Sequence, residues 1–213
     1  MLRLRLLLPF HLGPATPCHS VGCSQLCDPF GYHVLSCRGE GNLSIARHEL
    51  MVTAVSQLAS LAGLCSTPNA KVQCLGGKDN SLHMYRPADV QIGNMLVDIT
   101  IVSPLSASKA TSKQGQTPGT LVTSAADAKV RKHRDPASNA GFDFLPFAID
   151  TCGSLAADAR YILSYISYKY SSTTCKPLSA AKYIIVCRIS FALHLGIARQ
   201  LVACFNDCSE LTT

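Results

Sequence analysis

The sequence predicts an α/β fold in which a mixed central β-sheet is flanked by helices, with a small cysteine-rich segment at the N-terminal end. Two short β-branched runs meet at Gly93-Asn94, which is the pattern of a β-hairpin. Apolar residues recur at helical spacing in three further segments, 44–64, 155–170 and 180–205. The chain has 213 residues, of which 47% are hydrophobic, so it can bury one sizeable core.

The predicted hairpin fixes the position of two acidic residues. A two-residue turn at Gly93-Asn94 pairs Val90 with Val97 and therefore brings Asp89 opposite Asp98. Side chains alternate across a strand, so the apolar residues share one face of the hairpin and the two acids share the other. Directly opposed residues have Cβ atoms about 4.5–5.5 Å apart, a distance at which like charges repel.

Two carboxylates in this arrangement need a cation or a shared proton. Mg²⁺ or Mn²⁺, which prefer oxygen ligands, is therefore the expected cofactor at Asp89 and Asp98. The alternative is an exposed edge hairpin whose two acids are solvated.

Cysteine and histidine residues cluster between Cys18 and Cys37. The pattern is typical of a small tetrahedral zinc site: two cysteines are followed by a turn-rich gap and then by a histidine and a cysteine close together. The metal would replace a hydrophobic core that such a short segment cannot build. The predicted Zn²⁺ ligands are Cys18, Cys23, His33 and Cys37, and the alternative is a loop with incidental free cysteines.

Residues 44–64 are expected to form an amphipathic helix with Ser44 as its N-cap and Gly63 at its end. Its first turn is expected to carry Arg47, His48 and Glu49. Glu49 in that turn has an ordinary explanation, because the helix dipole favours an acid there.

A second, basic helix is expected from about Ser124 to His133, with Lys129 and Lys132 among its cations. Residues 68–85 are expected to form a loop. Residues 103–120 are expected to be either a flexible linker or a loop whose lysines, Lys109 and Lys113, contact phosphate. The alternative for the basic helix is a solvated charged face.

Composition limits the classes of partner and compartment only weakly. The net charge of +6 and the pI near 8.8 are compatible with a phosphate-rich partner but do not require one. The eleven cysteines are an odd number spread through apolar segments, which favours a reducing, intracellular compartment. The N-terminal apolar run is too short for a signal peptide, and no segment is expected to span a membrane.

Three motifs carry a resemblance to a known family: Arg86-Pro87-Ala88-Asp89, Val97-Asp98-Ile99-Thr100 and Asp127-Ala128-Lys129. They resemble the PD-(D/E)XK nucleases, and more narrowly the restriction-like endonuclease domain at the C-terminal end of non-LTR retrotransposon reverse transcriptase polyproteins. The resemblance runs from about Pro17 to about Gly153.

The same resemblance includes the cysteine-rich segment and a further strand. Five residues match the family's zinc knuckle: Asp28, Gly31, His33, Leu35 and Cys37. The family's first cysteine pair is closer in sequence, which leaves His19 and Cys27 as alternative ligands to Cys18. Residues 141–150 resemble the third core strand.

The resemblance implies a metal-dependent DNA endonuclease that hydrolyses phosphodiesters, with a restriction-endonuclease-like domain at 44–213 after a zinc knuckle at 1–43. It implies catalytic roles for Asp89, Asp98, Lys129 and Glu49 and nucleic-acid contacts for Arg47, His48, Arg86, Lys109, Lys113 and Lys132. DNA is the expected partner, the element's RNA a further candidate, and the nucleus the expected location. Two alternatives remain open, a catalytically inactive nucleic-acid-binding remnant and a purely structural zinc domain, and the oligomeric state is open as well.

Overall fold

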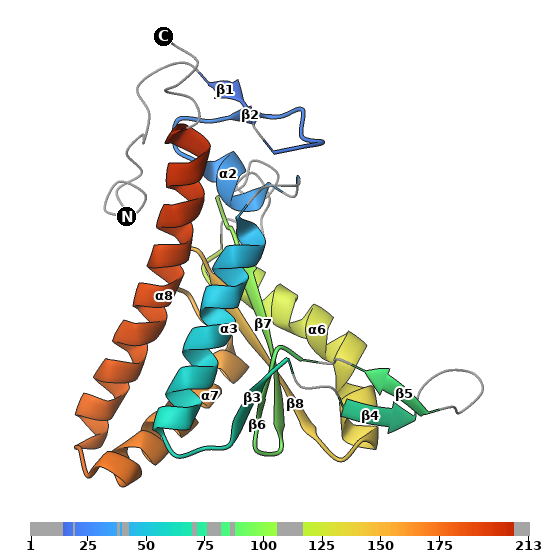
Figure 1. The fold of residues 1–213 in the computed structure, drawn as a ribbon, viewed down its shortest axis with the longest axis vertical. Coiled ribbons are helices and arrows are strands. Elements are labelled where there is room, and N and C mark those ends of the chain that lie inside the picture. The colour runs from blue at the N-terminus through green and yellow to red at the C-terminus, as the bar shows by residue number, and fades with distance from the viewer. Residues whose placement is uncertain are drawn as a thin grey trace.

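The computed structural model describes residues 15–18, 20–37, 39, 43–69, 72–75, 82–85, 88–105 and 117–206. Its centre is a four-stranded sheet in the order β3-β6-β7-β8, formed by Ser66–Pro68, Val90–Ile92, Met95–Val102 and Asp143–Asp150 (Figure 1). The first three strands pair antiparallel, and β7 pairs with β8 in parallel. The predicted mixed sheet flanked by helices is confirmed.

The hairpin has the predicted register. Val90 pairs with Val97 and Ile92 with Met95, and the turn is closed by Gly93, whose φ of +56° is the left-handed conformation that glycine adopts without strain. Val90 and Val97 are fully buried. The alternation of apolar residues therefore predicted correctly which face of the hairpin meets the core.

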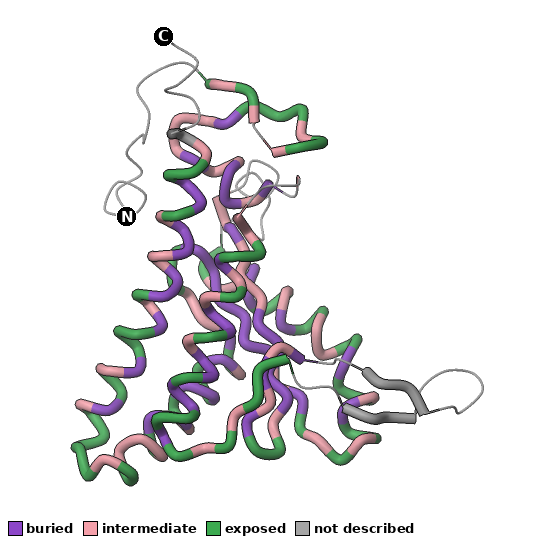
Figure 2. Tube along the Cα trace, viewed as in Figure 1, coloured by how far each residue is buried: buried purple, intermediate pink, exposed green. Residues whose placement is uncertain are grey.

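Helices cover both faces of the sheet (Figure 1). Three helices, α3 (Ser44–Leu61), α7 (Ala157–Thr174) and α8 (Leu178–Asn206), share the main hydrophobic core with one face. Helix α6 (Thr120–Asn139) packs on the other face through two smaller apolar clusters. Figure 2 shows the buried residues concentrated along the sheet and the inner sides of these helices.

Strand β8 is an edge strand, as a proline within it requires. Pro146 pairs with Asp98 of β7 and has no N–H to offer to a further strand. The strand expected within residues 141–150 is thus confirmed. It lies parallel to β7, the strand that carries Asp98.

Several predicted boundaries were wrong. Helix α3 ends at Leu61, and Leu43 precedes it without a side-chain cap, so Ser44 is its first residue rather than its N-cap. Glu49 consequently lies in the second turn, where the helix dipole does not explain it. Helix α6 begins earlier than predicted and continues through Pro136, because a proline in the last turn removes only one hydrogen bond.

The segment predicted as a loop between residues 68 and 85 contains a second hairpin. Strands β4 (Val72–Leu75) and β5 (Leu82–Tyr85) pair antiparallel as a separate two-stranded sheet. Both strands are short and adjoin a glycine-rich sequence, so the residue composition of this segment indicated a loop.

The N-terminal segment folds onto the helices. It contains β1 (Thr16–Pro17), β2 (Leu26–Cys27) and the short helix α2 (Tyr32–Ser36). Cys27, Val34 and Leu35 belong to the same core as α3 and α8. The division of the chain at residue 43 stays a prediction.

By length and composition, Leu178–Cys204 of α8 could cross a membrane, so the expectation that no segment could do so was wrong. An 18-residue window there has a mean hydropathy of 1.5, and 39% of it is buried inside the protein. Ile185, Leu193 and Ile197 of this helix lie in the main core. A core helix can meet the same criterion, and α8 packs against α3 and α7.

Candidate metal centres

The four predicted zinc ligands come together at the N-terminal end of the protein. One ligand atom from each of Cys18, Cys23, His33 and Cys37 lies within 4.8 Å of the other three. Cys18 Sγ is 3.7 Å from Cys37 Sγ, and Cys23 Sγ is 3.3 Å from His33 Nε2. Sulfur atoms around a tetrahedral zinc ion with bonds of about 2.3 Å lie about 3.8 Å apart. The cluster is compatible with zinc.

The turn before α2 explains why His33 and Cys37 face the same side. The Asp28 carboxylate accepts hydrogen bonds from three backbone N–H groups, those of Phe30 (3.0 Å), Tyr32 (3.2 Å) and His33 (2.7 Å). Gly31 takes a φ of +74° immediately before the helix. The helix then brings positions i and i+4 onto one face.

The surroundings of Cys18 favour its thiolate, whereas Cys18 and Cys37 act to raise the pKa of Cys23. Burial acts to raise the pKa of Cys18, but hydrogen bonds from Ser20, and further ones from His33 and Cys37, lower it to about 6. The Gly39 N–H donates to Cys37 Sγ at 3.4 Å. Thiolates are the form in which cysteine binds metal.

Cys27, an alternative ligand, lies beside Cys18 but is not one of the four converging residues. Its sulfur is 3.3 Å from that of Cys204 on α8, and burial raises the pKa of its thiol. Neither Cys27 nor Cys204 forms a disulfide. The geometry therefore favours Cys18 over Cys27, and His19 lies outside the described residues.

The two acidic residues of the hairpin lie side by side. Asp98 is in β7, and Asp89 directly precedes β6, where its N–H donates to Val97 O at 3.0 Å. The charge of the neighbouring Asp89 acts to raise the pKa of Asp98. The predicted adjacency of the two acids in the hairpin is confirmed, but Asp89 lies just outside β6 and contacts α3, whereas Asp98 contacts α6. Their catalytic role stays a prediction.

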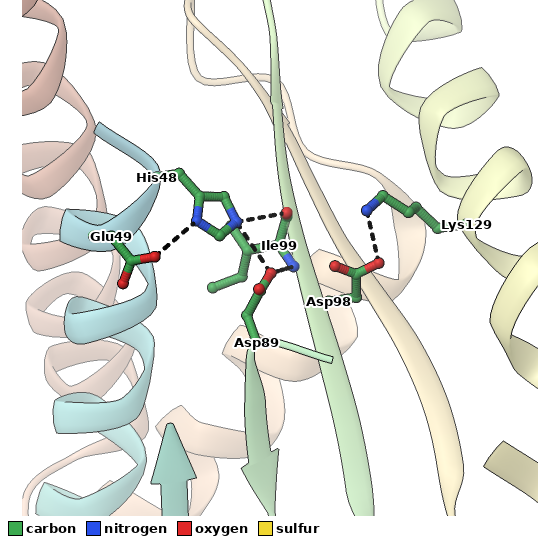
Figure 3. A network of polar contacts seen from close by, with 6 residues as sticks. All are labelled: His48, Glu49, Asp89, Asp98, Ile99 and Lys129. Atoms are coloured by element: carbon green, nitrogen blue, oxygen red, sulfur yellow. Dashed lines mark hydrogen bonds and ion pairs between the residues drawn. The ribbon is translucent and has the colours of Figure 1, made fainter. Parts of the chain in front are cut away.

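Asp89 is fixed from two directions (Figure 3). Its Oδ2 lies 3.0 Å from His48 Nε2 of α3 and accepts the Ile99 N–H at 2.8 Å. Burial acts to raise the pKa of Asp89, but the hydrogen bond and charge of His48 lower it overall. The same hydrogen bond raises the pKa of His48.

Asp98 faces the other helix layer, where Lys129 reaches it from α6 (Figure 3). Lys129 Nζ lies 2.9 Å from Asp98 Oδ2, an ion pair without the alignment of a hydrogen bond. Asp98 is only 6% exposed. Burial, together with the neighbouring charge of Asp89, raises its pKa to about 6 in spite of Lys129.

Glu49 lies beside this network but does not join it directly. Its side chain is exposed, and its Oε1 is 3.7 Å from His48 Nδ1, on the side of the imidazole that faces away from Asp89 (Figure 3). No contact between Glu49 and either aspartate is found among the described residues. Its predicted catalytic role stays a prediction.

Apart from His48, the predicted nucleic-acid contacts divide into three groups. Lys132 is exposed on α6, together with Arg131 and Arg134. Arg47 is only 5% exposed, and its guanidinium donates to Leu35 O and to Gln200 Oε1, which argues against a contact with DNA. Arg86, Lys109 and Lys113 lie outside the described residues.

The sequence did not indicate two features of this site. The imidazole of His48 was expected to contact phosphate, whereas it holds Asp89 and is half-buried. The backbone N–H of Ile99 also donates to Asp89, and a backbone donor cannot be recognised from the residue type. Consecutive helical residues point in different directions, but nothing in the local sequence indicates which of Arg47 and His48 faces the core.

Comparisons with known proteins add no family to these observations. The chain matches no protein-family model, and a search of curated proteins found no match. The resemblance to restriction-like endonuclease domains therefore rests on the residues and contacts described above.

Proposed function

We propose that this chain is a metal-dependent DNA endonuclease of the restriction-like type, derived from a retrotransposon and acting on nuclear DNA. The observation that carries the proposal is the meeting of Asp89, Asp98 and Lys129 at the end of the hairpin. These residue types in this order are the nuclease motif of the sequence. Zn²⁺ in the cysteine-rich cluster has, in the same proposal, a structural role.

The acid pair fits a hard divalent cation. Asp98 Oδ2 is buried and lies 2.9 Å from the Lys129 ammonium, and the ionised form of Asp98 is disfavoured by burial and by Asp89 in spite of that cation. Carboxylate oxygens are the donors that Mg²⁺ and Mn²⁺ prefer. Asp89 and Asp98 would hold the ion, which when bound supplies charge stabilisation of the phosphate and a water of lowered pKa.

The protein's own contribution is positioning and charge. His48 and the Ile99 N–H hold Asp89, so its carboxylate is fixed before substrate arrives. The Lys129 ammonium, 35% exposed, can turn from Asp98 towards a phosphate oxygen, where its charge is worth most in the transition state. The exposed cations Arg131, Lys132 and Arg134 on α6 offer contacts to the DNA backbone.

Lys129→Ala is expected to lower the rate of plasmid nicking with Mg²⁺ or Mn²⁺ by about 10²–10³, the usual effect of removing one charge-stabilising group. DNA affinity should fall only slightly, since one phosphate contact changes the salt dependence of binding by about one unit. The assay compares supercoiled and nicked plasmid with each metal and with chelator.

Lys132→Ala is the matched control, because it removes an exposed lysine from the same helix. It should weaken binding as much as Lys129→Ala does while leaving the cutting step intact. Equal loss of cutting in the two variants would show that Lys129 acts only as one more phosphate contact.

A second candidate is a nucleic-acid-binding module that no longer cuts. One observation favours it: members of the resembling family often have a glutamate before the Arg-Pro motif, and none occurs between Leu64 and Arg86. Wild-type protein that binds DNA but nicks it with no divalent metal would establish this candidate. Protein that neither binds nor cuts would leave only a structural role for the zinc cluster.

A further inference from the structure

We propose that His48 is a positioning residue that fixes the carboxylate of Asp89 at the candidate cation site by donating a hydrogen bond to its Oδ2. The inference rests on the proposed function, because it takes Asp89 to be a metal ligand. It assigns His48 to the metal site rather than to the DNA interface.

The hydrogen position on the imidazole follows from its partners. His48 Nε2 lies 3.0 Å from Asp89 Oδ2 and 3.1 Å from Ile99 O. A backbone carbonyl is only an acceptor, and an ionised carboxylate is only an acceptor. Nε2 must therefore carry the hydrogen, whether the ring is neutral or protonated.

Asp89 Oδ2 is consequently engaged by two donors. It accepts from His48 Nε2–H and from the Ile99 N–H at 2.8 Å. Two short hydrogen bonds to one oxygen restrict the rotation of the carboxylate, so the orientation of Asp89 depends on both donors. The two donors also fix the plane of the carboxylate, which a single donor does not.

The imidazole is itself held by a rigid part of the fold. The preceding residue, Arg47, is buried and bonds to Gln200 Oε1 of α8 at 2.8 Å and to Leu35 O of α2 at 3.4 Å. A Cβ added at Gly196 would come within 2.7 Å of the Arg47 side chain, so α8 approaches this turn of α3 closely. The contacts of Arg47 with α2 and α8 thus hold α3 at the turn from which His48 reaches the sheet (Figure 3).

The other charged residues near His48 do not position the Asp89 carboxylate. Glu49 Oε1 is 3.7 Å away on the Nδ1 side and can only influence the charge of the ring. Lys129 pairs with Asp98 on the other side of β7. Among the described contacts of the Asp89 side chain, His48 is the donor that comes from a helix, so it is the one that couples Asp89 to α3.

The test measures Mn²⁺ binding to the full chain by calorimetry for wild type, His48→Leu and His48→Gln. Removing the outer partner of a ligand typically costs 10–100-fold in metal affinity, so His48→Leu should weaken Mn²⁺ binding by about that factor. His48→Gln keeps a donor at the position of Nε2 and should recover most of the affinity. A control variant, Gln57→Leu, exchanges an exposed polar residue of the same helix and should bind as wild type does.

A spectroscopic measurement accompanies the titration. Nitrogen NMR of the wild-type imidazole should report hydrogen on Nε2 in the metal-free protein, and a ring with Nε2 unprotonated would overturn the inference. Thermal unfolding of His48→Leu separates a local effect from loss of the fold.

The outcomes distinguish the two proposals. Wild type that binds Mn²⁺ with the same affinity as His48→Leu overturns the role of His48 and leaves the proposed function standing. Wild type that binds no Mn²⁺ overturns both, since Asp89 is then not a ligand. Weaker binding by His48→Leu with recovery by His48→Gln supports the positioning role.

Discussion

Asp98→Asn is expected to abolish metal-dependent nicking and, at the same time, to stabilise the protein at pH 7. The carboxylate of Asp98 is buried beside Asp89, and this surrounding raises its pKa from 3.8 to about 6. Ionisation of Asp98 therefore destabilises the folded state. Asparagine has nearly the same shape without the charge, so it removes that destabilisation together with a metal ligand.

The size of the effect follows from the pKa shift. Each pKa unit corresponds to about 1.4 kcal/mol, and the shift to about 6 indicates roughly 1–3 kcal/mol of destabilisation when Asp98 is ionised. The attraction by Lys129 is already contained in this shift. In a protein of this size, 1 kcal/mol changes the melting temperature by about 2–4 °C.

The pH dependence has a definite sign. The folded protein binds the proton of Asp98 more tightly than the unfolded chain does, so this group's contribution to stability is present at pH 4 and is lost as the pH rises through about 6. Asp98→Asn should therefore gain little over wild type at pH 4 and its full advantage at pH 7.5. Binding of Mn²⁺ by wild type should weaken as the pH falls below about 6, because the ligand becomes protonated.

Denaturant unfolding of both proteins at the two pH values checks this expectation. Asp143→Asn is the matched control, because Asp143 is an exposed acid at the start of β8, away from the pair. It should leave nicking and stability unchanged. An Asp98→Asn protein that is less stable than wild type at pH 7.5 would mean that Lys129 and the carboxylate form a net stabilising pair.

The local part of this site could be predicted from the sequence, because it depends on short-range patterns. Alternating apolar residues around Gly93-Asn94 determine the register of the hairpin, and the register alone brings Asp89 to Asp98. The convergence of the four candidate zinc ligands was likewise predictable, since His33 and Cys37 lie four residues apart in and directly after one short helix.

Contacts that depend on packing could not be predicted in this way. Whether His48 reaches Asp89 depends on how α3 lies across the sheet, and whether Arg47 is buried depends on α8, more than 150 residues later in the chain. The family resemblance implied nucleic-acid contacts for both residues, and the sequence alone did not show that they pack inside the fold. A basic residue next to a histidine gives no information about which of the two faces the core.

Loss of zinc is expected to destabilise the whole protein rather than the N-terminal segment alone. Helix α2 has five residues and is too short to be stable by itself in water. Its Val34 and Leu35 belong to the main core, and the carbonyl groups of these two residues accept hydrogen bonds from Gln200 and Arg47. If the metal is lost, α2 loosens, and the buried Arg47 guanidinium loses one of its acceptors, which is costly for a buried charge.

Cys37→Ser tests this coupling. Cys37 is buried and its sulfur is one of the cluster atoms, so the variant should bind zinc weakly and lose about 10 °C in melting temperature. Because Arg47 directly precedes His48, which holds Asp89, the variant should also bind Mn²⁺ less tightly at the acid pair. Cys65→Ser, at an exposed cysteine outside the cluster, is the control and should behave as wild type. Metal analysis should find one zinc per chain in the wild type and the control. A Cys37→Ser protein with unchanged melting temperature and unchanged Mn²⁺ binding would mean that the cluster folds without metal and that α2 is held by its apolar contacts alone.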